Sequence, residues 1–284
     1  MGQSNGVSAS AEVEDLPAGQ EFGGYREPYR EAYQAKAAPR LVSVEGISPS
    51  SGTRGARNKA EAAEENAQGV KLLNSAQYDE AVRRFKRALA FEPGSVQILD
   101  NIGLAYAKRQ DYNSAYEWYE RAHTEDPEDV ETLFSLAWVE RKRQRYAHAR
   151  ELFTKVLEIA PSHSKALWLL GDILKNSQEF EGAIQKFETL VRMQPSSVDG
   201  HISLAQCFEA TKSYSRAAQM YTHILENLSP GRVDIHFALG KAYFQGKQYR
   251  QALLQLDRVP DSDARGFEAR SVAAKACREL EDHQ

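Results

Sequence analysis

The sequence predicts an all-α protein, specifically a right-handed α-solenoid of antiparallel helix pairs. The segment Tyr112–Pro127 recurs in register at Tyr78–Pro93, Tyr146–Pro161 and Phe180–Pro195, with looser copies at Tyr214–Pro230 and Tyr249–Pro260. An alanine returns every 34 residues, at Ala81, Ala115, Ala149, Ala183 and Ala217, and Ala252 follows after 35. A fixed period of this length is the signature of stacked repeats, in which each unit buries its apolar face against its neighbours.

Each repeat reads as two helices joined by a tight turn. In the second repeat, Ile102 and Tyr106 lie on the apolar stripe of a first helix expected over Val96–Lys108. Spacings of three and four residues between such positions are those of an amphipathic helix. The second helix is expected over Tyr112–Thr124, and Pro127 follows its end because proline cannot continue the hydrogen-bond ladder.

Small residues at one position of the first helices allow the two helices of a unit to approach closely. They are Gly69, Gly103, Ala137, Gly171, Ala205 and Gly240. The second helices carry aromatic residues that fill the space opposite, at Phe85, Tyr119, Phe153, Phe187 and Tyr221.

These residues form the pattern Leu-x-x-Leu/Ile-Gly-x-x-Tyr, then Tyr-x-x-Ala-x-x-x-Phe-x-x-Ala, then Pro, which resembles the tetratricopeptide repeat (TPR) with its 34-residue period. The resemblance covers residues 62–259 as six units. It implies a TPR superhelix that serves as a generic scaffold for binding proteins. The expected units are 62–95, 96–129, 130–163, 164–197, 198–232 and 233–262.

The two ends of the array depart from the pattern. The first unit has polar Glu65 and Gln68 where bulky apolar residues are usual, as expected of a terminal unit. In the sixth unit Pro260 falls where the second helix should continue, so a shortened helix is expected there. Residues 263–281 are predicted to form a capping helix that covers the last apolar face.

Residues 1–60 are rich in Gly, Ser, Ala, Glu and Pro and predict a disordered tail, with Gly52–Lys59 as a hinge. A short recognition element is expected near 22–37, where aromatic side chains gather at Phe22, Tyr25, Tyr29 and Tyr33. With Pro28 in a first helical turn, the tyrosines would share one face and could fold on a partner. The alternative is a tail whose tyrosines have no ligand.

Composition sets broad limits on function. The formal net charge of −4 gives no reason to expect nucleic-acid binding. The apolar runs are too short for membrane insertion, and the N-terminus lacks a secretory pattern. The two cysteines, Cys207 and Cys277, have no metal-ligand spacing. We therefore expect a cytoplasmic protein, either a monomer or a component of a multiprotein complex.

Neither an enzyme nor a cofactor is expected. The sequence contains no nucleophile elbow, phosphate-binding loop or zinc-protease helix. His201 and His236 occupy equivalent positions on successive first helices, and we expect them to pack rather than to share a metal.

The resemblance implies that first helices line a concave groove that binds a peptide or helix. The predicted partner-binding residues there are Leu104, Lys108, Phe134, Trp138, Arg141, Lys142, Trp168, Lys175, Phe237, Lys241 and Phe244. Two interpretations of the aromatic residues stay open, an exposed binding face or a core between units. The basic run Arg141–Arg145 is either a solvated turn or a contact for phosphate or acidic groups.

Three functions are compatible with this pattern. The first is a non-enzymatic adaptor whose groove captures apolar anchors flanked by acidic groups, while the tail recruits a second partner or occupies the groove itself. The second is a structural or assembly subunit of a larger complex, which packs through its convex face or array ends. The third is the recognition part of an enzyme whose catalytic chain lies elsewhere.

Overall fold

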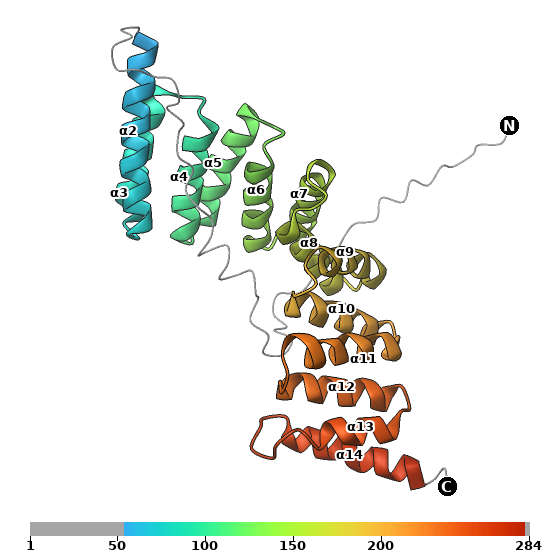
Figure 1. The fold of residues 1–284 in the computed structure, drawn as a ribbon. Helices are drawn as coiled ribbons and strands as arrows, with labels where there is room; N and C mark the ends of the chain where they lie inside the picture. The colour runs from blue at the N-terminus through green and yellow to red at the C-terminus, as the bar shows by residue number, and fades with distance from the viewer. Residues whose placement is uncertain (1–53, 282–284) are drawn as a thin grey trace, which may run out of the picture.

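The computed structural model describes residues 54–281, which form six antiparallel helix pairs followed by a single helix. The pairs are α2 (Arg54–Asn74) with α3 (Tyr78–Phe91), α4 (Val96–Lys108) with α5 (Tyr112–Glu125), α6 (Val130–Lys142) with α7 (Tyr146–Ile159), α8 (Ser164–Asn176) with α9 (Phe180–Met193), α10 (Val198–Ala210) with α11 (Tyr214–His223), and α12 (Val233–Gln245) with α13 (Tyr249–Leu256). The last helix is α14 (Gly266–Glu281). Figure 1 shows the pairs stacked in chain order along a curved path, with α2 and α14 at opposite ends. The predicted solenoid is confirmed.

The first helix begins earlier than the sequence indicates. Residues from Arg54 onward are already helical, so the segment Gly52–Lys59 is not a hinge over its described part. Arg57 and Glu61 form an i,i+4 ion pair in this first stretch, with atoms 2.9 Å apart. None of the helices among residues 54–281 is long and apolar enough to cross a membrane.

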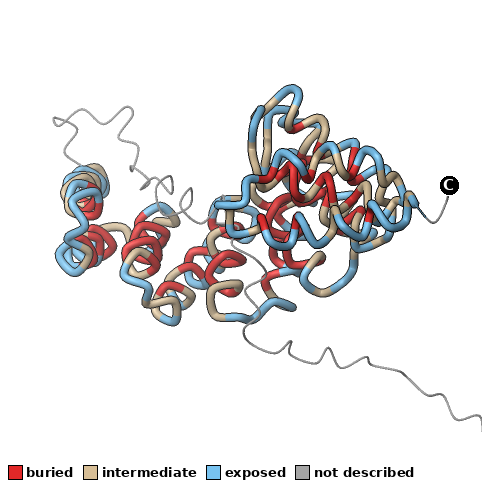
Figure 2. Tube along the Cα trace, turned by 90° about the horizontal axis from the view of Figure 1, so that it is seen from below, coloured by how far each residue is buried: buried red, intermediate tan, exposed pale blue. Residues whose placement is uncertain are grey.

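The core runs through the whole array, in the layers where helices face one another (Figure 2). The small first-helix residues receive the rings of the second helices, as predicted. A Cβ atom added to Gly103 would lie 2.8 Å from the Tyr119 ring, and one added to Gly171 would lie 2.9 Å from the Phe187 ring. Glycine is therefore required at these two positions for the observed helix approach.

The turn between the two helices of each unit is the same six times over. One residue per turn has a positive φ, at Ala76, Gln110, Gln144, Gln178, Lys212 and Lys247. In the second unit the amide of Asp111 then donates to the Tyr106 carbonyl over 3.0 Å, which ends the first helix with a Schellman motif. This turn sends the second helix back along the first.

The single 35-residue step has a local structural cause. A π-helical turn, η1 (Ile224–Leu228), follows α11, and the Ser229 amide donates to the Ile224 carbonyl over 2.7 Å. One extra residue is thereby absorbed within the helix without disturbing the stacking of the next unit. The shortened second helix of the sixth unit is also confirmed, because α13 ends at Leu256.

Candidate protein-interaction surface

We call the surface formed by α4, α6, α8, α10 and α12 the first-helix face. The sequence-predicted partner-binding residues all lie on these helices. They are Leu104 and Lys108 on α4, Phe134, Trp138, Arg141 and Lys142 on α6, Trp168 and Lys175 on α8, and Phe237, Lys241 and Phe244 on α12. They therefore lie on first helices, as the repeat pattern predicts, although α10 supplies none of them.

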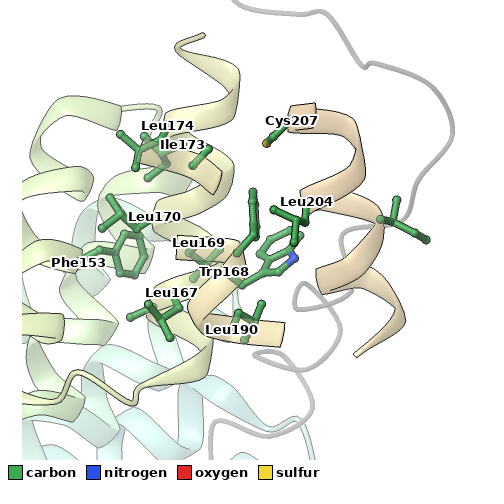
Figure 3. Packing of buried hydrophobic residues seen from close by; sticks show 14 of the residues in the cluster. Phe153, Leu167, Trp168, Leu169, Leu170, Ile173, Leu174, Leu190, Leu204 and Cys207 are labelled. Carbon is green, nitrogen blue, oxygen red and sulfur yellow. The ribbon is translucent and has the colours of Figure 1, made fainter. Parts of the chain in front are cut away.

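The large aromatic residues of this face belong to the core. Trp138 is only 3% exposed and Trp168 only 4% exposed, and Phe134 and Phe237 are also buried. Figure 3 shows the Trp168 indole directed toward α10, where it packs beside Leu204. Of the two interpretations left open by the sequence, the core between units is therefore the one observed for these four residues. These rings pack against other helices of the array, and this burial stabilises the stack.

Ring contacts show how these side chains are held. The Phe134 ring lies 5.7 Å from the Phe153 ring, and the Trp138 indole meets Tyr112 edge-on with centroids 5.8 Å apart. Phe244 is only half-buried, and its ring lies 5.7 Å from that of Tyr249. Among the aromatic residues predicted on the first helices, Phe244 is therefore the one with substantial access to solvent.

A polar bridge joins α6, α8 and α10 at this face. Arg141 Nη2 donates to Asp172 Oδ2 over 2.9 Å, and Lys175 Nζ lies 3.6 Å from Asp172 Oδ1. Lys175 also donates to Gln206 Oε1 over 3.2 Å. Arg141 and Lys175, two of the cations predicted to bind a partner, thus both interact with Asp172 within the array.

Similar bridges link other neighbouring first helices. Asn101 donates to Asn66, Thr132 donates to Asp100, and Lys241 donates to Glu268 on α14. The repeat pattern places Asp172 and Gln206 at groove-facing positions of first helices, but it does not single out Thr132. Each of their contacts between units joins residues 31 or 32 positions apart, two or three fewer than the 34-residue period, and so links equivalent faces of neighbouring first helices.

Several lysines at this face keep partial access to solvent. Lys108 and Lys142 occupy equivalent positions in the last turns of α4 and α6, and both are half-buried. Burial lowers the pKa of Lys108. The Lys142 amine lies 5.4 Å from the Trp138 ring centroid, and the Lys241 amine lies 5.1 Å from that of Phe237. These lysines place positive charge at the rim of the buried aromatic layer.

The basic run Arg141–Arg145 is partly paired within the array, by Glu140 of its own unit and by Asp172 of the next. The Glu140 side chain is fully buried and pairs with Arg143, while Arg145 Nη1 lies 3.8 Å from Glu140 Oε2. His148 Nδ1 lies 2.9 Å from the same carboxylate. The run thus satisfies a buried carboxylate, and this internal pairing reduces the charge available to an external anion.

The two histidines singled out by their equivalent positions have different neighbours. His201 faces the His223 ring, with centroids 4.9 Å apart, whereas His236 Nδ1 lies 2.8 Å from Gln255 Oε1. Within residues 54–281, no group of three or more His, Cys, Asp or Glu side chains is placed to hold a metal ion. The predicted tail element of Phe22, Tyr25, Tyr29 and Tyr33 lies outside the described residues.

Comparisons with known proteins agree with this architecture. Tetratricopeptide-repeat models match residues 94–162, 169–231 and 210–276. No curated protein sequence matches the chain.

Solved structures share the fold at low sequence identity. MamA from Desulfovibrio magneticus RS-1 (residues 41 to the end) is 22% identical with a TM-score of 0.55, covering 58% of this chain and 94% of its own. YrrB, a TPR protein with an unusual peptide-binding site, is 16% identical with a TM-score of 0.57, covering 70% of this chain and 97% of its own. The matched repeat models and the shared fold lead to one conclusion: the chain belongs to the tetratricopeptide repeat family.

Proposed function

We propose that this chain is a non-enzymatic scaffold that holds a peptide or helix of a partner protein along its first-helix face. Membership of the family supports a role in protein interaction, because stacked helix pairs offer a long continuous surface to a ligand. The peptide-binding site described for YrrB supports a peptide as one class of ligand. Since the aromatic rings are covered, polar contacts would contribute most to recognition.

The observation that carries the proposal is the equivalent placement of Lys108 and Lys142. Neighbouring packed helices lie about 8–10 Å apart, and an extended peptide advances about 3.3 Å per residue. Acidic side chains roughly three residues apart on an extended peptide would therefore reach both amines. The proposed ligand is thus an acidic segment rather than an apolar one.

The tail has a proposed role of its own. Residues 22–37 would recruit a second partner, or would occupy the first-helix face of the same molecule and compete with the ligand. A tethered segment has a high effective concentration, so even a weak tail interaction would inhibit binding.

A charge reversal tests the role of the first-helix face. Lys108→Glu/Lys142→Glu should weaken binding of the captured partner's acidic peptide about tenfold or more, or ~1.4 kcal/mol. Lys155→Glu/Lys186→Glu, on the second helices α7 and α9, is the matched control and should retain affinity. Partners would be captured from native lysate, identified by mass spectrometry and titrated as peptides, with circular dichroism checking each variant. Equal affinity of all three proteins would refute the proposal.

An assembly role is a second candidate, and one observation favours it. Two of the most exposed large apolar side chains, Leu254 and Phe267, lie at the C-terminal end of the array. An array end that carries apolar surface is suited to packing against another protein.

A further inference from the structure

The last helix repeats the pattern of a first helix. Continuing the 34-residue step from Gly240 leads to Ala274, the position at which each preceding unit holds the small residue that faces its second helix. Gly240 itself packs against Leu256, since an added Cβ would lie 2.7 Å from Leu256 Cγ. A tetratricopeptide-repeat model also extends to residue 276, within α14. By this register, α14 is the first helix of a seventh unit.

The face of α14 on which a second helix would pack carries Phe267, Ala274 and Cys277, and we call it the seat. No other helix among residues 54–281 covers it. Ala274 and Cys277 are exposed, whereas Gly103, Gly171 and Gly240 are buried beneath their second helices. Phe267, at the start of the same face, is 80% exposed. An apolar stripe of this kind on a helix normally packs against another helix.

A cavity adjoins this seat. It has a volume of ≈ 690 Å³ and lies between α13 and α14, with Leu253, Leu254, Ala269 and Ala273 among its lining residues. Leu254 is 67% exposed. The cavity is large enough for a bulky side chain, so a helix lying on α14 could place an aromatic ring there.

The chain also contains a segment whose sequence resembles the second helix of a repeat unit, although no first-helix pattern precedes it. Every second helix of the six units begins with Tyr or Phe followed three residues later by Ala, as in Tyr78–Ala81 and Tyr249–Ala252. The same pattern occurs at Tyr29–Ala32, preceded by Pro28, which favours a helix start, and Pro39 limits the helix to residues 29–38. It departs from the repeat at Lys36, where the units carry an aromatic residue or Leu256. Tyr33, one turn before Lys36, would supply the bulky side chain instead.

We propose that residues 28–38 of one molecule form a helix that docks on α14 of a second copy and completes its seventh unit. The inference rests on the proposed roles of the tail and of the C-terminal array end, and its failure leaves the proposed binding at the first-helix face untouched.

Reach favours a second copy over the same molecule. Residues 39–53 join this segment to α2, and fifteen residues span at most about 50 Å when fully extended. Six steps between neighbouring first helices, at about 8–10 Å each, separate α2 from α14 along the array. The tether would have to be stretched fully to bind in cis, whereas a second molecule meets no such limit. The contact is head-to-tail, so further copies can add to the same assembly.

Two variants test the proposal, one with a change in the seat on α14 and the other with a change in the docking segment. Ala274→Glu places a charge in the seat of one copy, and Ala32→Glu places one on the docking face of the segment. Ala274 is exposed and Ala32 lies outside the described residues, and circular dichroism would verify the helices. Gln251→Glu, an exposed change on α13 that does not line the cavity, is the matched control.

Mass would be measured by sedimentation velocity over a range of concentrations. We expect wild type and Gln251→Glu to associate as concentration rises, and each of Ala274→Glu and Ala32→Glu to stay monomeric alone. An equimolar mixture of those two should form a dimer and go no further, because the mixture contains one intact segment and one intact seat per pair.

Three results would overturn the inference. One is a wild type that stays monomeric at every concentration. Another is Ala32→Glu associating as wild type does, which would mean that α14 is covered by another surface of the second copy. The third is a mixture of the two variants that remains monomeric.

Discussion

Arg141 on α6 and Asp172 on α8 form an ion pair, with atoms 2.9 Å apart, in which both side chains are nearly buried. Asp172 also lies 3.6 Å from the amine of Lys175 on its own helix. One carboxylate thereby receives two cations at the junction of the third and fourth units. This pair holds two neighbouring first helices in register, a role that cross-unit polar contacts serve along much of the array.

We expect Asp172→Asn to destabilise the protein by about 3 kcal/mol, because it leaves the Arg141 guanidinium buried without a countercharge. The loss of unfolding free energy in the double variant Arg141→Met/Asp172→Asn should be smaller than the sum of the losses in the two single variants. Urea denaturation followed by circular dichroism measures both. Glu188→Gln breaks the more exposed Arg216–Glu188 pair and serves as the control, with an expected cost below about 1 kcal/mol. An equal loss of unfolding free energy in Asp172→Asn and Glu188→Gln would contradict this account.

Two glycines in the fourth unit should respond to alanine in opposite directions. An added Cβ at Gly171 would lie 2.9 Å from the Phe187 ring, so Gly171→Ala should cost about 1–3 kcal/mol. At Gly182, within α9, the nearest contact is 3.4 Å to Leu174, an ordinary van der Waals distance. Gly182→Ala should stabilise the helix by up to about 1 kcal/mol. Thermal denaturation of the two variants would compare them, and a gain from Gly171→Ala would show that the ring moves aside.

The interhelical turns offer a stabilising substitution. Gln144 adopts a φ of 62°, a left-handed conformation that costs a non-glycine residue roughly 1 kcal/mol. Gln144→Gly should therefore raise the free energy of unfolding by several tenths of a kcal/mol, after the entropy lost by glycine is subtracted. The matched control is Gln185→Gly, in the interior of α9, which should instead lose about 1 kcal/mol. A loss of stability in both variants would contradict the prediction.

The stacked histidines predict a pH dependence. Burial lowers the pKa of His201, and the nearby His223 lowers it further, although a hydrogen bond to the Ser197 carbonyl acts in the opposite direction. The folded state therefore resists protonation, while the unfolded state takes up a proton near pH 6.5. Stability is fully present above this pH and is lost as pH falls through the unfolded value toward the folded one.

His201→Leu should reduce the loss of unfolding free energy as the pH falls, because it removes the titrating group. Leucine should fit this position, since Leu99, Leu133 and Leu167 occupy it in earlier units. Urea denaturation between pH 8 and pH 5 would compare the slopes of unfolding free energy for the two proteins. The values at pH 8 report packing alone and serve as the reference. Because burial also lowers the pKa of His163 and His123, a smaller slope should persist in the variant. Identical slopes would exclude His201 as a contributor.

The sequence by itself determined the repeat architecture. The alanines at a step of 34 residues, the glycine and ring pairs such as Gly103 with Tyr119, and the early Pro260 all act through local helix periodicity and the packing of two adjacent helices. These features depend on contacts between residues of the same repeat unit, so the sequence of a single unit is enough to predict them. The shortened α13 followed from the same reasoning.

Only the tertiary structure decided which side chains of the first-helix face are exposed to solvent. Trp138 and Trp168 have the spacing of face residues, yet neighbouring units bury them, and Arg141 pairs with an aspartate on the next first helix. The helix start at Arg54 and the π-turn at Ile224–Leu228 were also beyond the repeat pattern. The physical reason is that side-chain exposure depends on how one unit rotates against the next, and that rotation is set by packing across units rather than by periodicity within one helix.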